Sequence, residues 1–240
     1  FITGTVSTAT APVRAKIRAG HTVFASVCLE AGSGGGVALG PVLGGLMADA
    51  VGYRAAFYMT AALLVLGGVM VWLWVREGEK PDRAGPAKRR GWTLWAGILN
   101  APGVRVTYAF RFLVLLGRQM ITPIAPIFIA SLLLSAQGAN TYTGLVIGAA
   151  ALATTLSSGT LGRLGDRLGH RRVALVSAAI AGALYVPQAW VVDVWQLLAM
   201  QALVGVAMGG VIPSISALLA DYTERGEEGA VYGLDNSINA

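Results

Sequence analysis

Long apolar segments alternate with short polar ones along the whole chain. Six apolar segments have the length of a membrane span, at about residues 22–47, 54–75, 105–133, 142–162, 173–192 and 196–220. A helix needs about 20 residues to cross a bilayer, and it satisfies its backbone hydrogen bonds internally. The pattern therefore predicts an all-α integral membrane protein, a helical bundle with six complete transmembrane helices. Shorter apolar runs at 1–11 and 231–240 predict two partial helices, as expected of an internal fragment of a longer protein.

The composition agrees with a membrane protein and disfavours other classes. Only 12% of the residues are charged and the mean hydropathy is +0.64, whereas soluble domains carry about 25% charged residues. The net charge of +6 does not indicate a nucleic-acid partner, because the basic residues are confined to a few loops. A single Cys28 excludes an internal disulfide, and two distant histidines, His21 and His170, give little support to a metal site. We expect no cofactor, and no enzyme activity because the spans hold no cluster of His, Asp or Ser.

The positions of the basic residues predict the orientation. Of the eighteen Lys and Arg residues, fifteen lie in loops on one side of the predicted membrane, one lies on the other side, and two lie within a span. The positive-inside rule places the basic side in the cytoplasm. We therefore expect a multi-pass protein of the plasma (inner) membrane, with 22–47 running outward and 54–75 running inward.

The longest connection between spans, residues 76–104, divides the chain. It carries many charges and is read as a cytoplasmic linker between two helical halves, 1–75 and 105–240. Within it, four apolar residues recur at helical spacing and predict a short helix in the inner interface. An irregular linker anchored by two tryptophans fits the same residues, which are Trp92, Trp95, Ile98 and Leu99.

A glycine-rich stretch in the first span predicts close helix packing. Glycines recur every four residues, and small residues let helix backbones approach each other. The span 142–162 offers a matching stripe, so we expect these two helices to cross closely. Pro41 is expected to bend the first of them. The two stripes are Gly32, Gly36, Gly40 and Gly44, and Gly144, Gly148, Ala151, Thr155 and Gly159.

Prolines interrupt two other spans. Pro123 and Pro126 are expected to break the outer half of 105–133, and Pro213 to break 196–220 in the same way.

The segment 162–172 holds five charges and three glycines between two spans. It predicts a tight polar hairpin. Its skeleton G-x-[LM]-x-D-x-x-G-x-R also occurs at 45–54, on the opposite side of the predicted membrane. The glycines suit helix ends, and the aspartate can cap a helix or face the N-terminus of the next one. Repeat ancestry and generic turn chemistry both remain open as the cause.

Three polar residues within the spans are candidate functional groups. Arg118 lies about 20 Å into its helix at 1.5 Å per residue, so Arg118 and the adjoining Gln119 are predicted to line a cavity, or to pair with a neighbouring helix. Glu30 is the only acid within a complete span, and desolvation would raise its pKa toward values useful for proton coupling. A salt bridge is the alternative for Glu30. Arg111 lies nearer the inner end and is expected to snorkel.

Two motifs resemble those of a known family. The loop residues Gly162, Leu164, Asp166, Arg167, Gly169 and Arg171 resemble the signature loop of the major facilitator superfamily between its eighth and ninth helices. The residues Gly36, Gly40, Pro41, Gly44 and Gly45 resemble the fifth-helix motif of its drug:proton antiporters. Val27 and His170 depart from those patterns. The resemblance covers the whole chain, from the fourth helix to the start of the eleventh.

The resemblance implies a function and a mechanism. A secondary transporter of this superfamily rocks two halves about a central site, so a small molecule and protons are its expected partners in the bilayer, with a monomer when full length. Proton-coupled efflux of drugs or other amphipathic compounds is expected, with uptake of a small metabolite as the alternative. A channel or receptor finds less support. The loop implies a cytoplasmic latch, with Asp166 near the N-terminus of the 22–47 helix.

Overall fold

The structure is a computed structural model that describes residues 22–74, 103–135 and 137–221, and within 22–33 it describes the backbone and Gly32 alone. These residues form helices and contain no strand, which confirms the all-α fold. The partial terminal helices, the segment with Trp92 and Trp95, and the side chain of Glu30 lie outside the description. The helices are α2 (Thr22–Ala50), α3 (Tyr53–Trp74), α5 (Val104–Ile121), α6 (Ala125–Leu132), α7 (Ala139–Leu168), α8 (His170–Gln188) and α9 (Val194–Asp221).

Each predicted span is present as helix. Four stretches of the described chain are long and apolar enough to cross a membrane: Tyr53–Trp74, Val104–Leu132, Ala139–Leu168 and Val194–Leu219. The other two predicted spans, α2 and α8, are single helices of 29 and 19 residues. The chain is therefore a multi-pass membrane protein.

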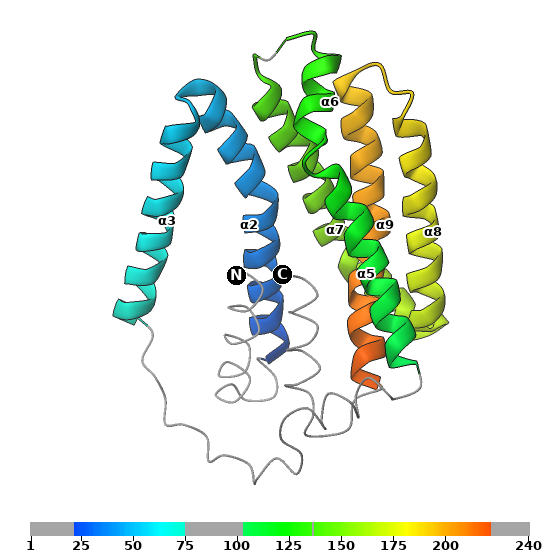
Figure 1. Cartoon of the computed structure of the whole chain (residues 1–240). Helices are drawn as coiled ribbons and strands as arrows, with labels where there is room; N and C mark the ends of the chain where they lie inside the picture. Colours follow the sequence, from blue (N-terminus) through cyan, green and yellow to red (C-terminus); the bar gives the residue numbers. More distant parts are fainter. Residues whose placement is uncertain (1–21, 75–102, 136, 222–240) are drawn as a thin grey trace.

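Successive connections lie at opposite ends of the bundle (Figure 1). The α2–α3, α6–α7 and α8–α9 connections share one end, and the α7–α8 connection lies at the other. We name these the α2–α3 end and the α7–α8 end. This alternation is the one that the order of apolar and polar segments predicted.

Helix α7 is central, because it packs against α2 and against α9. Its contact with α9 uses small residues: a Cβ on Gly205 would meet the carbonyl oxygen of Ala150, and the hydroxyls of Thr154 and Ser157 donate to the carbonyl oxygens of Gly205 and Val206, both at 3.0 Å. Such close backbone approach is typical of helix pairs in membranes. A larger apolar core joins α5, α8 and α9 and consists of Val104, Tyr108, Ala181, Val204, Ala207, Met208, Val211, Ile215 and Leu219.

The prolines have different effects on the two spans. Pro123 lies between α5 and α6, so the predicted break in 105–133 is confirmed. The predicted break at Pro213 is wrong, because α9 is one helix from Val194 to Asp221. A proline removes a single backbone hydrogen bond, and the packing of α9 against α7, α8 and α5 keeps its other turns in place.

The segment 162–172 is more helical than expected. Helix α7 continues to Leu168 and α8 begins at His170, so Gly169 alone lies between them. Gly169 has φ 93° and ψ 128°, a conformation that is open to glycine and strained for other residues. The predicted polar hairpin is therefore a one-residue turn between two long helices.

Candidate functional site

The two helices that carry the glycine stripes cross closely, as predicted. A Cβ on Gly144 would meet the carbonyl oxygen of Pro41, and one on Gly148 would lie 2.7 Å from that of Ala38. Farther along, Gly45 lies against Asn140, and Gly34 lies against Thr155. Along this series the residue numbers on α2 increase while those of their partners on α7 decrease, so the two helices are antiparallel. Their backbones touch over most of this length.

The face of α2 that makes this contact differs from the expected one. A Cβ on Gly32, Gly36, Gly40 or Gly44 would meet nothing within 4 Å in the described part of the chain. An α-helix turns about 100° per residue, so steps of four residues drift around the axis by about 40° each. The contact instead follows steps of four, three and four residues, through 34, 38, 41 and 45. Pro41 and Gly45 are the members of the predicted motif that take part.

A cluster of hydrogen bonds joins α2 to the start of α7 at the α2–α3 end. The Asp49 carboxylate accepts from the Thr141 backbone amide at 2.7 Å, from the Thr141 hydroxyl at 2.6 Å and from the Asn140 side-chain amide at 2.8 Å. The Tyr53 hydroxyl also exchanges hydrogen bonds with Asn140, at 3.0 and 3.3 Å. The cluster therefore holds residues from α2, α3 and α7.

Asp49 serves as the N-terminal cap that α7 does not supply itself. The N-cap residue of α7 is Gly138, which makes no side-chain cap hydrogen bond. The first amide groups of a helix need an acceptor, and Asp49 supplies one to Thr141, the third helical residue. A carboxylate is further stabilised at the positive end of the helix dipole, by about 0.3–1 kcal/mol when exposed.

These contacts keep Asp49 ionised. Asp49 lies beyond the predicted span 22–47, one residue before the end of α2. Desolvation raises its pKa, but the hydrogen bonds from Thr141 and Asn140 together outweigh that effect and hold the pKa below the ordinary aspartate value. Asp49 therefore stays a carboxylate at neutral pH.

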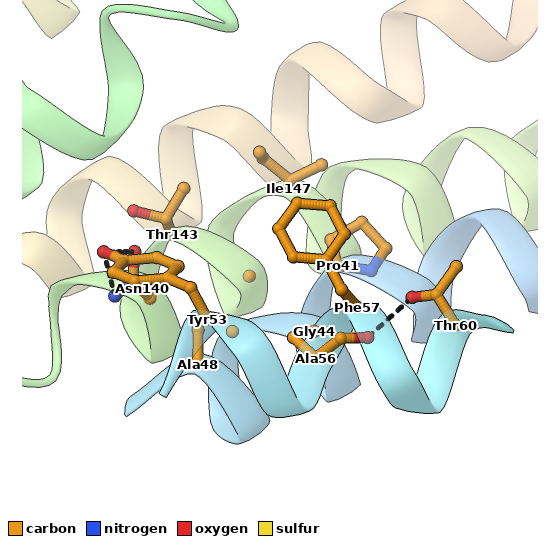
Figure 2. A pocket seen from close by; sticks show the side chains of 12 residues that line it. Pro41, Gly44, Ala48, Tyr53, Ala56, Phe57, Thr60, Asn140, Thr143 and Ile147 are labelled. Atoms are coloured by element: carbon orange, nitrogen blue, oxygen red, sulfur yellow. Dashed lines mark hydrogen bonds between the residues drawn. The ribbon is translucent and has the colours of Figure 1, made fainter. Parts of the chain in front are cut away.

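A pocket of about 360 Å³ lies between α2, α3 and α7, next to this cluster. Figure 2 shows Tyr53 and Asn140 at one side of it and Phe57, Pro41 and Ile147 at the other. Its lining is mainly apolar, with hydroxyl and amide groups from Thr60, Thr143 and Asn140. Small residues on α2, including Gly44, Gly45 and Ala48, provide the space.

At the opposite end of the pair, the charged motif faces solvent. The Asp166 side chain is 72% exposed and lies 3.3 Å from Nε2 of His170 on α8. Arg163, Leu164, Arg167 and Arg171 are also exposed, whereas Gly165 is buried against the His170 ring. The predicted contact of Asp166 with the start of α2 stays a prediction, since those side chains of α2 lie outside the description.

The polar residues of α5 lie in different surroundings, some exposed and one buried. Arg118 and Gln119 are exposed, and Arg118 lies close enough to Tyr185 of α8 to interact with it electrostatically. Arg118 stands in the middle of the 29-residue span Val104–Leu132. Arg111 is 7% exposed and belongs to the buried face of α5, with Tyr108 and Val104. The expectation that Arg111 snorkels is therefore wrong, because its helix face turns toward the core.

Comparison with known proteins identifies the family. The family model of the Major Facilitator Superfamily matches residues 1–115 and 107–240. The chain belongs to the Major Facilitator Superfamily. Similar proteins named "Multidrug resistance protein MdtG" occur in Dickeya zeae (strain Ech586), with 25% identity, and in Rahnella sp. (strain Y9602), with 27% identity. Each match covers 98% of this chain and 57% of the relative, so the chain spans a little over half the length of these relatives.

Within this superfamily chain, the sequence pointed to Asp49 but missed its partners. Its place in the repeated skeleton indicated a helix-capping role, and the next helix, α3, was the expected neighbour. The structure instead places the N-terminus of α7 there, 92 positions along the chain. No signal in the sequence marked the need for this cap: the predicted span starts at 142 after Thr141, itself a suitable N-cap residue, whereas the helix begins at Ala139 after Gly138.

Proposed function

We propose that the full-length protein is a secondary transporter that works by alternating access and exports amphipathic small molecules in exchange for protons. The observation that carries this proposal is the close antiparallel crossing of α2 and α7 in a chain of the Major Facilitator Superfamily. The crossing joins the part of the chain before residues 75–102 to the part after it. We assign these parts, 1–75 and 105–240, to two halves that rock about this contact, with 76–104 as their cytoplasmic linker.

Export is favoured over uptake by two observations. The glycine-proline motif of α2 contributes Pro41 and Gly45 to the crossing. The similar proteins carry the name of multidrug resistance proteins. Uptake of a small metabolite by the same fold is the alternative.

The route for substrate and protons is proposed to include Arg118, Gln119 and Glu30. A charge at the middle of a span costs about 2.5–3.5 kcal/mol when it faces lipid, so such a residue usually faces a cavity or other helices. Arg118 is exposed at that depth. We assign proton coupling to Glu30, since Asp49 is held ionised at neutral pH.

The proposed setting is the plasma (inner) membrane, with the basic loops in the cytoplasm and a monomer as the working unit. At the α7–α8 end, Gly162, Leu164, Asp166, Arg167, Gly169 and Arg171 would form the cytoplasmic gate, with Asp166 closing on the start of α2.

Efflux from living cells tests the proposal. The full-length gene is expressed in a bacterial strain without its own exporters, and the loss of preloaded ethidium is followed by fluorescence. Export predicts faster loss than in cells with an empty vector, and a return to the background rate when an uncoupler collapses the proton gradient. Efflux that survives the uncoupler would overturn the proton exchange. Faster ethidium accumulation instead of loss would support uptake.

A further inference from the structure

We infer that Asp49, Asn140, Thr141 and Tyr53 form a latch that holds the α2–α3 end of the α2–α7 crossing closed and opens in each transport cycle. This inference rests on the alternating access proposed above. It concerns residues at the end of the crossing opposite to the superfamily's signature loop.

The first step is the position of the cluster. Below it, α2 and α7 touch backbone to backbone at Pro41 and Gly144 and again at Ala38 and Gly148. The cluster lies farther along, about two turns beyond Pro41 on α2 and about one turn before Gly144 on α7, where α7 begins and α2 ends. Any motion that separates α2 from α7 at this end must first break the hydrogen bonds of Asp49.

The second step is the chemistry of the contact. Three donors from the first turn of α7 converge on one carboxylate, and charge-assisted hydrogen bonds are stronger than neutral ones. All three bonds are nevertheless solvent-exposed. Water can therefore replace each partner when the helices separate. The charge makes the contact strong enough to favour the closed state, and the access of water keeps its opening reversible.

The third step is the symmetry of the pair. The skeleton that carries Asp49 at the end of α2 recurs at the end of α7, where it carries Asp166. The two turn glycines, Gly52 and Gly169, share almost the same φ, 95° and 93°. Because the helices are antiparallel, the two aspartates lie at opposite ends of one crossing. In this structure Asp49 is bonded to Thr141 of α7, and Asp166 lies 3.3 Å from His170 of α8. The recurrence places one aspartate at each end of the crossing, as alternate closing of the two ends requires.

The test measures opening without using transport. In the full-length protein with Cys28 and any cysteine outside residues 1–240 replaced by serine, a cysteine is introduced by Thr143→Cys. Thr143 is 8% exposed and lines the pocket next to Asn140. The rate at which a membrane-impermeant maleimide reaches this thiol reports opening at the α2–α3 end. Asp49→Ala is expected to raise the rate about tenfold or more, the order expected for one lost charge-assisted hydrogen bond.

Two further variants make the result specific. Asp193→Ala removes an exposed carboxylate from the α8–α9 connection at the same end and is expected to leave the rate unchanged. Thr141→Val removes the hydroxyl donor and is expected to give a smaller increase. Combined with Asp49→Ala it should add little, because the two residues share one contact.

The outcomes separate the latch from the transporter. An unchanged rate in Asp49→Ala protein that elutes as the parent does would overturn the latch, and so would fully additive effects of the two changes. If Asp49→Ala protein does not fold, Thr141→Val alone decides, with an unchanged rate counting against the latch. If Asp49→Ala raises the labelling rate and the parent full-length protein exports no ethidium, the latch is supported and the proposed export is overturned.

Discussion

Gly45, Gly144 and Gly148 differ from the other described glycines of α2 and α7 in what lies beside them. At each of these three positions, a backbone oxygen of the partner helix occupies the space that a Cβ would need. Backbone atoms cannot move aside as a flexible side chain can, so any larger residue must separate the helices. The close contact of α2 and α7 therefore depends on these three glycines, whereas a Cβ on glycines such as Gly159 would meet nothing within 4 Å in the described part of the chain.

Gly144→Ala is therefore expected to destabilise the protein, although alanine favours helix. Its methyl group would meet the carbonyl oxygen of Pro41, and overpacking of this kind costs about 1–3 kcal/mol. The measurement is the melting temperature of the purified full-length protein in detergent. Gly159→Ala, in the same helix with nothing within 4 Å of the added methyl group, should melt at or above the parent temperature. Equal melting of the two variants would contradict the crossing described here.

Arg118 is the residue whose substitution should affect transport most directly among those described. Arg118→Ala removes a charge from the middle of the span, and we expect a loss of ethidium efflux of about tenfold, the effect of about 1.4 kcal/mol. Arg118→Lys keeps the charge and should retain more activity. Initial efflux rates at matched expression provide the measurement. Efflux at the parent rate in the alanine variant would leave the arginine with a structural role alone.

On the scale of elements, the sequence predicts the helices well because their signal is local. The first residues of α3, α7 and α9 lie within about three residues of the predicted starts of their spans. The extension of α7 to Leu168 was missed because charges and glycines suggested a loop, whereas helix geometry tolerates them once the chain leaves the apolar layer. The break between α5 and α6 was predictable, since two prolines occur within four residues.

The contact partners of the helices were harder to predict than the helices. A stripe of glycines tells which helix packs closely, and it correctly indicated α2 and α7. It does not tell which side of α2 makes the contact, because glycines occupy half of the positions between 32 and 45 and lie on several sides of that helix. The hydrogen bonds between Asp49 and Thr141 depend on how α2 and α7, which are far apart in the sequence, cross in space. The local sequence around either residue carries no signal for this crossing.

The α7–α8 connection provides a prediction at the element scale. Gly169 alone joins two long helices with a positive φ of 93°, and forcing another residue into such a conformation costs about 1–3 kcal/mol. Gly169→Val should lower the melting temperature of the full-length protein. Gly182→Ala, at an exposed and open position in α8, is the control and should not lower it. A Gly169→Val protein as stable as its parent would mean that the turn adapts to a side chain.

At the scale of the whole molecule, the alternating connections and the distribution of charge make one joint prediction about topology. Ser135 and Val192 are exposed at the α2–α3 end, whereas Leu168 is exposed at the α7–α8 end among the arginines. In the full-length protein with Cys28 and any cysteine outside residues 1–240 replaced by serine, each is replaced singly by cysteine. A membrane-impermeant maleimide should label Ser135→Cys and Val192→Cys in intact cells, and Leu168→Cys after permeabilisation, because basic loops stay in the cytoplasm. A permeant maleimide should label all three and shows that each thiol is reactive. The reverse pattern would invert the orientation and place the Asp49 cluster on the cytoplasmic side. Labelling of all three from outside would contradict the alternating crossing itself.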